Sequence, residues 1–160
     1  MAWIIESKSI DETEAAAQEL ATHLKPGDFI ALEGDLGAGK TQFVRGLAQG
    51  LGLMDEVSSP TFTILQIYNQ GETPLHHFDL YRLTDSEDVI QSGLEDTLFN
   101  PAAISVVEWS ERIPDLIPET AWIVRIERSQ DLPPVIDGIL PTDELPRILT
   151  IRQAKEGVPD

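Results

Sequence analysis

One stretch near the start of the chain has residues of the types and spacing that bind phosphate groups. Residues 34–41 read Gly-Asp-Leu-Gly-Ala-Gly-Lys-Thr and fit the pattern G-x-x-x-x-G-K-[ST]. Its glycines allow backbone conformations closed to other residues, so that successive N–H groups can converge on an anion. Lys40 then supplies a point charge for the β- and γ-phosphates, and the Thr41 hydroxyl is placed to ligate Mg²⁺. We therefore expect a nucleotide to bind along Leu36, Gly37, Ala38, Gly39, Lys40, Thr41 and Gln42.

The segments on either side predict the strand, loop and helix that this motif needs. Phe29–Leu32 is an apolar run short enough to be a buried parallel strand. After the motif, apolar residues recur at helical spacing, and Gly52 can end that helix. These residues are Phe43, Val44, Leu47, Ala48 and Leu51. The alternative is a chance glycine turn, but the fixed positions and both flanks favour phosphate binding.

Two acidic residues are expected at the ends of later strands. Leu75–Leu83 is predicted to be a strand that carries Asp79 near its end, and Ala103–Val107 is a short buried strand that leads into Glu108. A carboxylate at a strand end is where a phosphate-loop fold holds a metal ion or its water shell. We expect Lys40, Asp79 and Glu108 to be catalytic, and Thr41 and both acids to hold the metal. The sequence leaves open which acid orients the attacking water.

Two neighbouring features allow both a functional and an ordinary interpretation. Val57–Thr63 is a Ser/Thr-rich loop after the predicted helix, where many nucleotidases keep a nucleotide-sensing switch. Its hydroxyl residues Ser59, Thr61 and Thr63 are the candidates, and an ordinary loop broken by a proline is equally consistent with the sequence. Trp109 follows Glu108 directly; taken alone, a tryptophan is more often a core residue than a catalytic one.

The remaining segments complete an alternating pattern of strands and helices. Further strands are predicted at 2–6, 121–127 and 147–152, and a hairpin is predicted between 62–68 and 75–80. A longer helix begins after Ser9, which has capping-box spacing with Glu12, and short helices are predicted at 86–91 and 94–99. This order predicts an α/β protein with a mixed, mostly parallel central sheet flanked by helices.

Adjacent histidines at 76 and 77 point to opposite faces of the predicted strand, so a two-histidine metal site is not expected. We expect one of them to be packed and the other exposed. Residues 129–146 are rich in Pro, Asp and Gly and are predicted to form a surface excursion, and residues 156–160 a frayed tail.

Composition sets limits on the class of protein. At 160 residues the chain is predicted to be one domain, over residues 1–155, and the absence of cysteine excludes disulfides and thiolate zinc sites. Its net charge of −17 repels nucleic acid and anionic membranes, so any RNA is expected to be held by a partner protein. Neither a signal peptide nor a membrane-spanning run is apparent, which favours a cytoplasmic protein.

Four stretches follow one another in an order that is highly specific as a set: Gly-Asp-Leu-Gly-Ala-Gly-Lys-Thr, Ser-Pro-Thr-Phe-Thr, His-Phe-Asp-Leu-Tyr-Arg-Leu and Val-Glu-Trp-Ser-Glu. In this the chain strongly resembles the TsaE (YjeE-type) ATPase family, which acts in the biosynthesis of threonylcarbamoyladenosine at position 37 of tRNAs reading ANN codons. The resemblance runs from the first strand to about Glu127.

The resemblance implies a small P-loop domain that hydrolyses ATP slowly alone and faster in a complex with the TsaB and TsaD proteins. Carried over by position, Lys40 is the phosphate lysine, Thr41 a magnesium ligand, Asp79 the first acid and Glu108 the second acid, usually assigned to magnesium. Trp109 matches the tryptophan beside the nucleotide, and Ser59–Thr63 matches the switch-like loop. The implied partners are TsaB and TsaD, with tRNA contacted only indirectly.

Other function classes use the same loop. A small-molecule kinase needs an acceptor pocket and usually an arginine-bearing lid, and no such cluster stands out in the sequence. A nucleotide-gated interaction module, with incidental hydrolysis, also fits. A GTPase is disfavoured because no Asn-Lys-x-Asp motif occurs. No arginine finger is evident within the chain, although Arg82 is a candidate alongside a surface ion pair or partner contact.

Overall fold

A seven-stranded mixed sheet joins strands from both ends of the chain, in the order β1-β7-β6-β2-β5-β4-β3. The computed structural model describes residues 2–35, 37–129 and 146–156. The strands are β1 (Ala2–Ser7), β2 (Phe29–Gly34), β3 (Leu65–Tyr68), β4 (Leu75–Asp79), β5 (Ile104–Glu108), β6 (Trp122–Arg128) and β7 (Arg147–Gln153). The helices are α1 (Ile10–Ala21), α2 (Lys40–Gly50), α3 (Ser86–Gln91) and α4 (Glu95–Leu98), with short 3-10 turns η1 (Ser110–Arg112), η2 (Pro114–Leu116) and η4 (Ala154–Glu156).

The middle of the sheet is parallel and its edges are antiparallel. Strands β6, β2, β5 and β4 run parallel to one another, whereas β3 pairs with β4, and β7 with β6 and β1, in the antiparallel sense. The prediction of a mixed sheet, parallel at its centre, is therefore confirmed. Ser129 N–H donates to the Pro146 carbonyl at 2.7 Å, which continues the β6–β7 ladder by one step. Most of the predicted excursion at 129–146, and of the predicted tail at 156–160, lies outside the described residues.

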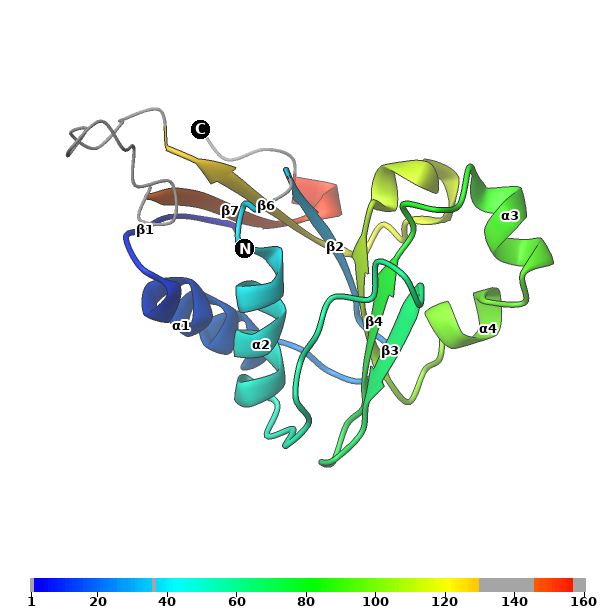
Figure 1. Ribbon diagram of the computed structural model, residues 1–160, viewed down its shortest axis with the longest axis horizontal. Coiled ribbons are helices and arrows are strands. Elements are labelled where there is room, and N and C mark those ends of the chain that lie inside the picture. Colours follow the sequence, from blue (N-terminus) through cyan, green and yellow to red (C-terminus); the bar gives the residue numbers. More distant parts are fainter. Residues whose placement is uncertain (1, 36, 130–145, 157–160) are drawn as a thin grey trace.

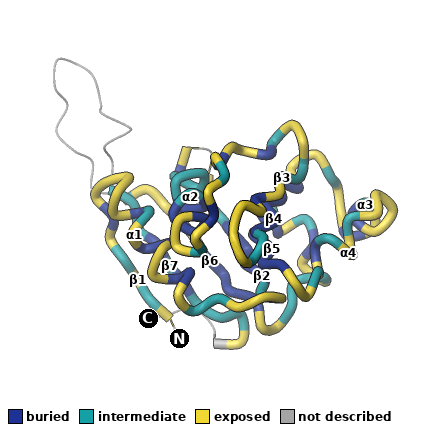
Figure 2. Tube along the Cα trace, turned by 90° about the horizontal axis from the view of Figure 1, so that it is seen from below, coloured by how far each residue is buried: buried dark blue, intermediate teal, exposed yellow. Residues whose placement is uncertain are grey.

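Apolar side chains on the two faces of the sheet belong to two separate cores. Helices α1 and α2 lie together on one face, and α3 and α4 lie at the other end of the molecule (Figure 1). On β2, Ile30 and Leu32 belong to the core under α1 and α2, whereas Phe29 and Ala31 belong to the core shared with α3, α4 and η2. The central strands are accordingly buried along their length, with exposed segments at the periphery (Figure 2). Among the described residues, no helix combines the length and apolar character needed to cross a bilayer.

Local signals placed most elements correctly. Ser9 accepts a hydrogen bond from the Glu12 N–H at 3.1 Å, so the capping spacing does begin α1. The β3–β4 hairpin is also present, but β3 begins three residues later than predicted. The Thr63 and Ile64 N–H groups turn back to the Pro60 carbonyl, and Ile64 has a φ of 68°. Strand β4 likewise ends at Asp79, before the predicted Leu83, because the Leu83 N–H turns back to the Leu80 carbonyl.

Both histidines of β4 are buried, so the prediction that one of them is exposed is wrong. His76 is 6% exposed and His77 is 0% exposed. They do point to opposite sides: His76 Nδ1 lies 3.1 Å from the Thr97 carbonyl of α4, and His77 Nε2 lies 2.6 Å from Glu108 Oε2 on β5. The alternation was right, but both faces of β4 are covered in the folded protein.

Close approach of α1 to α2 generates a stability prediction at Gly46. A methyl group there would meet the Glu14 carbonyl oxygen at 2.4 Å and the Ala17 methyl at 2.7 Å. Helix propensity alone favours alanine by about 1 kcal/mol, whereas forcing atoms into a packed contact costs about 1–3 kcal/mol. Since the clash is with backbone, we expect Gly46→Ala to lower the free energy of unfolding, measured by urea denaturation, by about 2 kcal/mol. A gain in stability would mean that the helices do not approach this closely.

Candidate active site

A cleft of about 1310 Å³ opens between the glycine-rich segment, the start of α1 and the carboxyl ends of the parallel strands. This volume exceeds that of most small-molecule sites, so a nucleotide fits within it. Outside the glycine-rich segment and the Ser/Thr-rich loop, its lining includes the predicted site residues Lys40, Thr41, Asp79, Glu108 and Trp109. The sequence therefore identified residues that converge on a single cleft, although they come from three different segments of the chain.

The glycine-rich segment links β2, which ends at Gly34, to α2, which begins at Lys40. Gly37 and Gly39 have φ angles of 77° and 110°, which side-chain-bearing residues rarely adopt. A Cβ on Gly34 would also lie 2.8 Å from the Ile126 carbonyl of β6. The glycines are therefore needed for the conformation, as predicted. Ala38 and Gln42 line the same cleft, while Leu36 lies outside the described residues.

Two arginines that were not predicted from the sequence hold this segment from the side of β6 and β7. Arg128 and Arg147 are register partners on those strands. Arg147 Nε donates to the Ala38 carbonyl at 2.9 Å, and one terminal nitrogen of each arginine donates to the Gly37 carbonyl at 3.3 Å. These bonds join residues about a hundred positions apart, so no local sequence signal could have found them.

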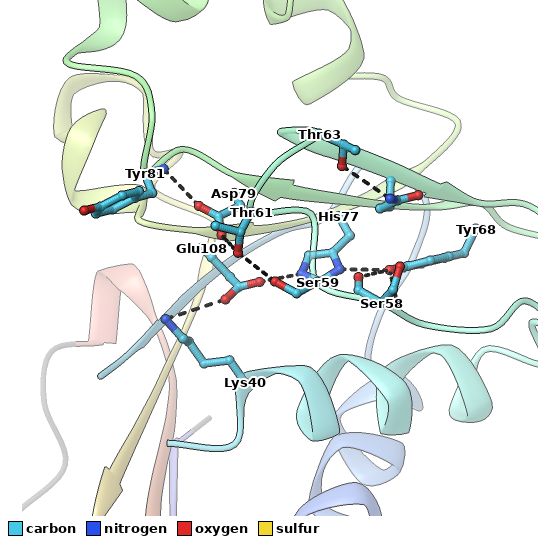
Figure 3. Close-up of polar contacts among 11 residues, drawn as sticks. Lys40, Ser58, Ser59, Thr61, Thr63, Tyr68, His77, Asp79, Tyr81 and Glu108 are labelled. Atoms are coloured by element: carbon cyan, nitrogen blue, oxygen red, sulfur yellow. Dashed lines mark hydrogen bonds and ion pairs between the residues drawn. The ribbon is translucent and has the colours of Figure 1, made fainter. Parts of the chain in front are cut away.

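Lys40 and the two acids line the cleft, and Lys40 points toward Glu108 (Figure 3). Asp79 and Glu108 are register partners on β4 and β5, and Lys40 Nζ lies 3.6 Å from Glu108 Oε1. Both carboxylates are almost fully buried, at 3% and 5% exposure. Buried charges of this kind need partners, and Glu108 has Lys40 on one oxygen and His77 on the other.

Asp79 is held by the loop that precedes β3. Thr61 Oγ1 donates to Asp79 Oδ2 at 3.0 Å, and the Tyr81 N–H donates to Asp79 Oδ1 at 2.9 Å. Ser59 Oγ lies 2.8 Å from Thr61 Oγ1, which brings a second predicted hydroxyl to the acid (Figure 3). Thr63 instead accepts from Gln66 Nε2 at 3.3 Å and is exposed, so the structure does not bring it to the acids.

His77 and Tyr68 extend the contacts of Glu108 back to the same loop. The Tyr68 hydroxyl lies 3.0 Å from His77 Nδ1, donates to the Ser58 carbonyl at 2.9 Å and accepts from the Ser58 N–H at 3.3 Å. No role was predicted from the sequence for either side chain. His77 does stand two residues before Asp79, on the same face of β4, but its contact with Glu108 depends on the pairing of β4 with β5.

Trp109 lines the cleft at the point where the chain leaves β5. Its backbone is left-handed, with φ of 60°, which turns the chain into η1. The indole lies 5.0 Å from the Tyr81 ring, and Lys40 Nζ lies 5.7 Å from its centroid. A tryptophan taken alone was expected in the core; this one is half-buried, packs against the core shared with α3, α4 and η2, and also lines the cleft. Arg82 is exposed, with its guanidinium 4.9 Å from the Phe62 ring.

The oxygen donors of Thr41, Asp79 and Glu108 fit magnesium better than a metal that needs a closed protein cage. Within the described ranges, no group of three or more His, Asp or Glu side chains is arranged to hold a metal ion. Mg²⁺ is usually held by one or two carboxylates together with phosphate oxygens and water. A hydroxyl at Thr41 and the two carboxylates supply donors of that kind at the edge of the cleft.

These features define the structural class of the protein. It is a mixed α/β protein in which a glycine-rich loop, a lysine and two buried acids face one cleft. A family model described as "Threonylcarbamoyl adenosine biosynthesis protein TsaE" matches residues 7–133. The chain belongs to the TsaE family.

Relatives and a solved structure support this assignment. The Bacillus subtilis (strain 168) tRNA threonylcarbamoyladenosine biosynthesis protein TsaE is 47% identical over 122 residues, covering 76% of this chain and 75% of the relative. The Synechocystis protein of the same description is 44% identical over 111 residues, covering 67% and 69%. The crystal structure of Bacillus subtilis YdiB superposes with a TM-score of 0.72 at 34% identity, covering 94% of this chain and 84% of that one.

Burial at Tyr68 generates a prediction for alkaline pH. Burial raises the pKa of the Tyr68 hydroxyl, the Ser58 backbone hydrogen bond opposes that rise, and the charges of Glu108 and Asp55 add to it. Because the folded state holds this proton more tightly than the unfolded state, the contribution is complete below about pH 10 and is lost as pH rises beyond it. The difference in unfolding free energy between wild type and Tyr68→Phe should therefore shrink above about pH 10, by at most about 1.4 kcal/mol per pH unit. A difference that stays constant to higher pH would contradict the pKa shift.

Proposed function

We propose that this protein is a magnesium-dependent ATPase that converts ATP and water to ADP and phosphate in support of threonylcarbamoyladenosine formation on tRNA. The observation that carries the proposal is the meeting of Lys40 with Glu108 at 3.6 Å beside the glycine-rich loop, with Asp79 in register next to Glu108. Phosphoryl transfer to water requires a phosphate-binding loop, a cation and acidic residues close together, and these are the features found here.

The residues act chiefly by positioning and charge. Phosphoryl transfer passes through a loose transition state in which negative charge spreads over the γ-phosphate oxygens. The backbone N–H groups of Gly37, Gly39, Lys40 and Thr41, together with the Lys40 ammonium, stabilise that charge, whereas the Ala38 N–H donates to the Asp35 carbonyl. Thr41, Asp79 and Glu108 would hold Mg²⁺. When bound, Mg²⁺ supplies further positive charge at the phosphates. A carboxylate of Asp79 or Glu108 orients the attacking water or takes its proton.

Burial and hydrogen bonding hold Asp79 and Glu108 in place for the proposed hydrolysis. Asp79 accepts two hydrogen bonds and Glu108 contacts His77 before any nucleotide binds, so little reorganisation is needed during the reaction. Trp109 borders the site from the other side of Lys40 and gives the nucleotide an apolar wall.

The place of this activity in the cell follows from the family and from charge. A chain of net charge −17 repels tRNA, so we propose that the TsaB and TsaD proteins carry the RNA and the carbamoyl chemistry, and that this protein serves their complex through ATP. The proposed setting is the cytoplasm, without a membrane partner.

Removing the Lys40 ammonium should abolish hydrolysis while leaving the fold intact. We expect Lys40→Ala to reduce phosphate release from ATP by at least about 100-fold, because the transition-state charge loses its nearest cation. Lys25→Ala is the matched control, since Lys25 is exposed and outside the cleft lining. Circular dichroism checks the fold of both variants, and wild-type turnover in Lys40→Ala would remove Lys40 from the mechanism.

Adding the proposed partners should accelerate hydrolysis. Arg82 stacks on Phe62, and the arginines near the loop, Arg128 and Arg147, donate to its carbonyls, so we expect a partner to complete the charge at the γ-phosphate. Phosphate release should rise by at least about tenfold when TsaB and TsaD are present together, a modest part of what a supplied cation can give.

The reaction products distinguish the alternative functions: a phosphorylated small molecule in place of free phosphate would identify a kinase. Full pathway function in a variant that binds ATP without hydrolysing it would identify a gated interaction module.

A further inference from the structure

An unbroken chain of polar contacts leads from the phosphate lysine to the backbone of the loop before β3. It runs from Lys40 to Glu108 (3.6 Å), from Glu108 to His77 (2.6 Å), from His77 to Tyr68 (3.0 Å) and from Tyr68 to Ser58 (2.9 Å; Figure 3). Its three inner members, Glu108, His77 and Tyr68, are buried. The activity proposed above accounts for the first two residues only.

On the catalytic side, the imidazole decides where the Glu108 carboxylate points. A glutamate side chain has several rotatable bonds, and its contact with Lys40 at 3.6 Å is too long to fix them. The contact with His77 Nε2 is much shorter, and the His77 ring is 0% exposed on a central strand. The His77 contact therefore holds one carboxylate oxygen and leaves the other directed at Lys40.

On the loop side, Tyr68 holds the backbone of the segment that reaches the other acid. Its hydroxyl satisfies both the N–H and the C=O of Ser58, a role usually filled by a neighbouring strand. From Ser58 the chain runs directly to Ser59 and Thr61, and Thr61 donates to Asp79. The loop is thus tied to both acids, directly to Asp79 and through Tyr68 and His77 to Glu108.

We propose that His77 and Tyr68 are positioning residues that couple the orientation of Glu108 to the conformation of the Val57–Thr63 loop. A movement of this loop on nucleotide or partner binding then changes the acid that acts on the phosphates, without direct contact between Ser58 and Glu108. The inference rests on the proposed hydrolysis for its kinetic consequence, but the structural link itself does not depend on that activity.

A double-mutant cycle in the full chain tests the coupling. We expect Tyr68→Phe to lower kcat for ATP hydrolysis by about tenfold, in keeping with the cost of misplacing a catalytic group, and to change KM for ATP less than about twofold. In the Glu108→Gln background the same change should lower kcat by less than about twofold, because coupled residues are not additive. Equal losses in both backgrounds would show that Tyr68 only stabilises the fold and would overturn the proposal.

Hydrogen exchange supplies a measurement that does not need turnover. His77→Gln keeps a polar group near Glu108 but shortens the reach toward Tyr68, and we expect faster amide exchange in residues 57–63. The matched control is His76→Gln, the adjacent buried histidine, which contacts the Thr97 carbonyl on the other side of β4. Unchanged exchange in His77→Gln, or the same increase in His76→Gln, would overturn the link.

These two arms separate the proposals. If the wild-type chain releases no phosphate, even with its partners, the proposed ATPase fails, and the exchange comparison alone decides whether the link exists. If wild type is active but Tyr68→Phe retains its kcat, the coupling fails and the ATPase stands. Thermal unfolding of each variant confirms that losses are measured on folded protein.

Discussion

The parallel pairing of β5 with β2 on one side and with β4 on the other is the constraint on which the site depends. It sets Leu32, two residues before the glycine-rich loop, opposite Glu108, and it sets Glu108 opposite Asp79. Parallel strands end at the same edge, so the loop and both acids emerge side by side. The two cores that cover the sheet fix this register, because a slip by one residue would send the apolar residues of β2 and the carboxylate of Glu108 to the wrong faces.

Burial of two carboxylates at this edge has an energetic consequence that the surrounding residues must offset. Each ionised acid loses solvation, and an unpaired one would destabilise the fold strongly. The structure provides Thr61 and the Tyr81 N–H for Asp79, and Lys40 and His77 for Glu108. These partners come from the helix, the strand and two loops, so the same contacts that make the acids tolerable also join separate elements into one polar unit.

Local sequence patterns predicted the features that depend only on residues close together in the chain. The loop, its flanking strand and helix, and the positions of Asp79 and Glu108 at strand ends all follow from runs of residue types in one stretch. Strand register does not follow from such local runs. For that reason the contact of His77 with Glu108 was not predicted, and neither were the contacts of Arg128 and Arg147 with the loop. The prediction that one of the two histidines is exposed was wrong for a similar reason. The alternation of side chains along a strand gives the face on which each one lies but not what covers that face.

Charge in the cleft bears on why a divalent cation belongs to the proposed reaction. Among the residues that the structure describes, four basic side chains line the cleft: Lys8, Lys40, Arg125 and Arg147. Six acidic side chains of the same described ranges line it as well: Glu33, Asp35, Asp79, Glu108, Glu111 and Glu127. Arg125 already forms an ion pair with Glu33, with a terminal guanidinium nitrogen 3.0 Å from Glu33 Oε2. The side chains alone therefore do not offset a triphosphate, and bare ATP would meet repulsion at the acids. In the proposed reaction, a nucleotide that carries Mg²⁺ would meet Asp79 and Glu108 as ligands and not as repelling groups, so the proposal requires the metal-bound form of the substrate.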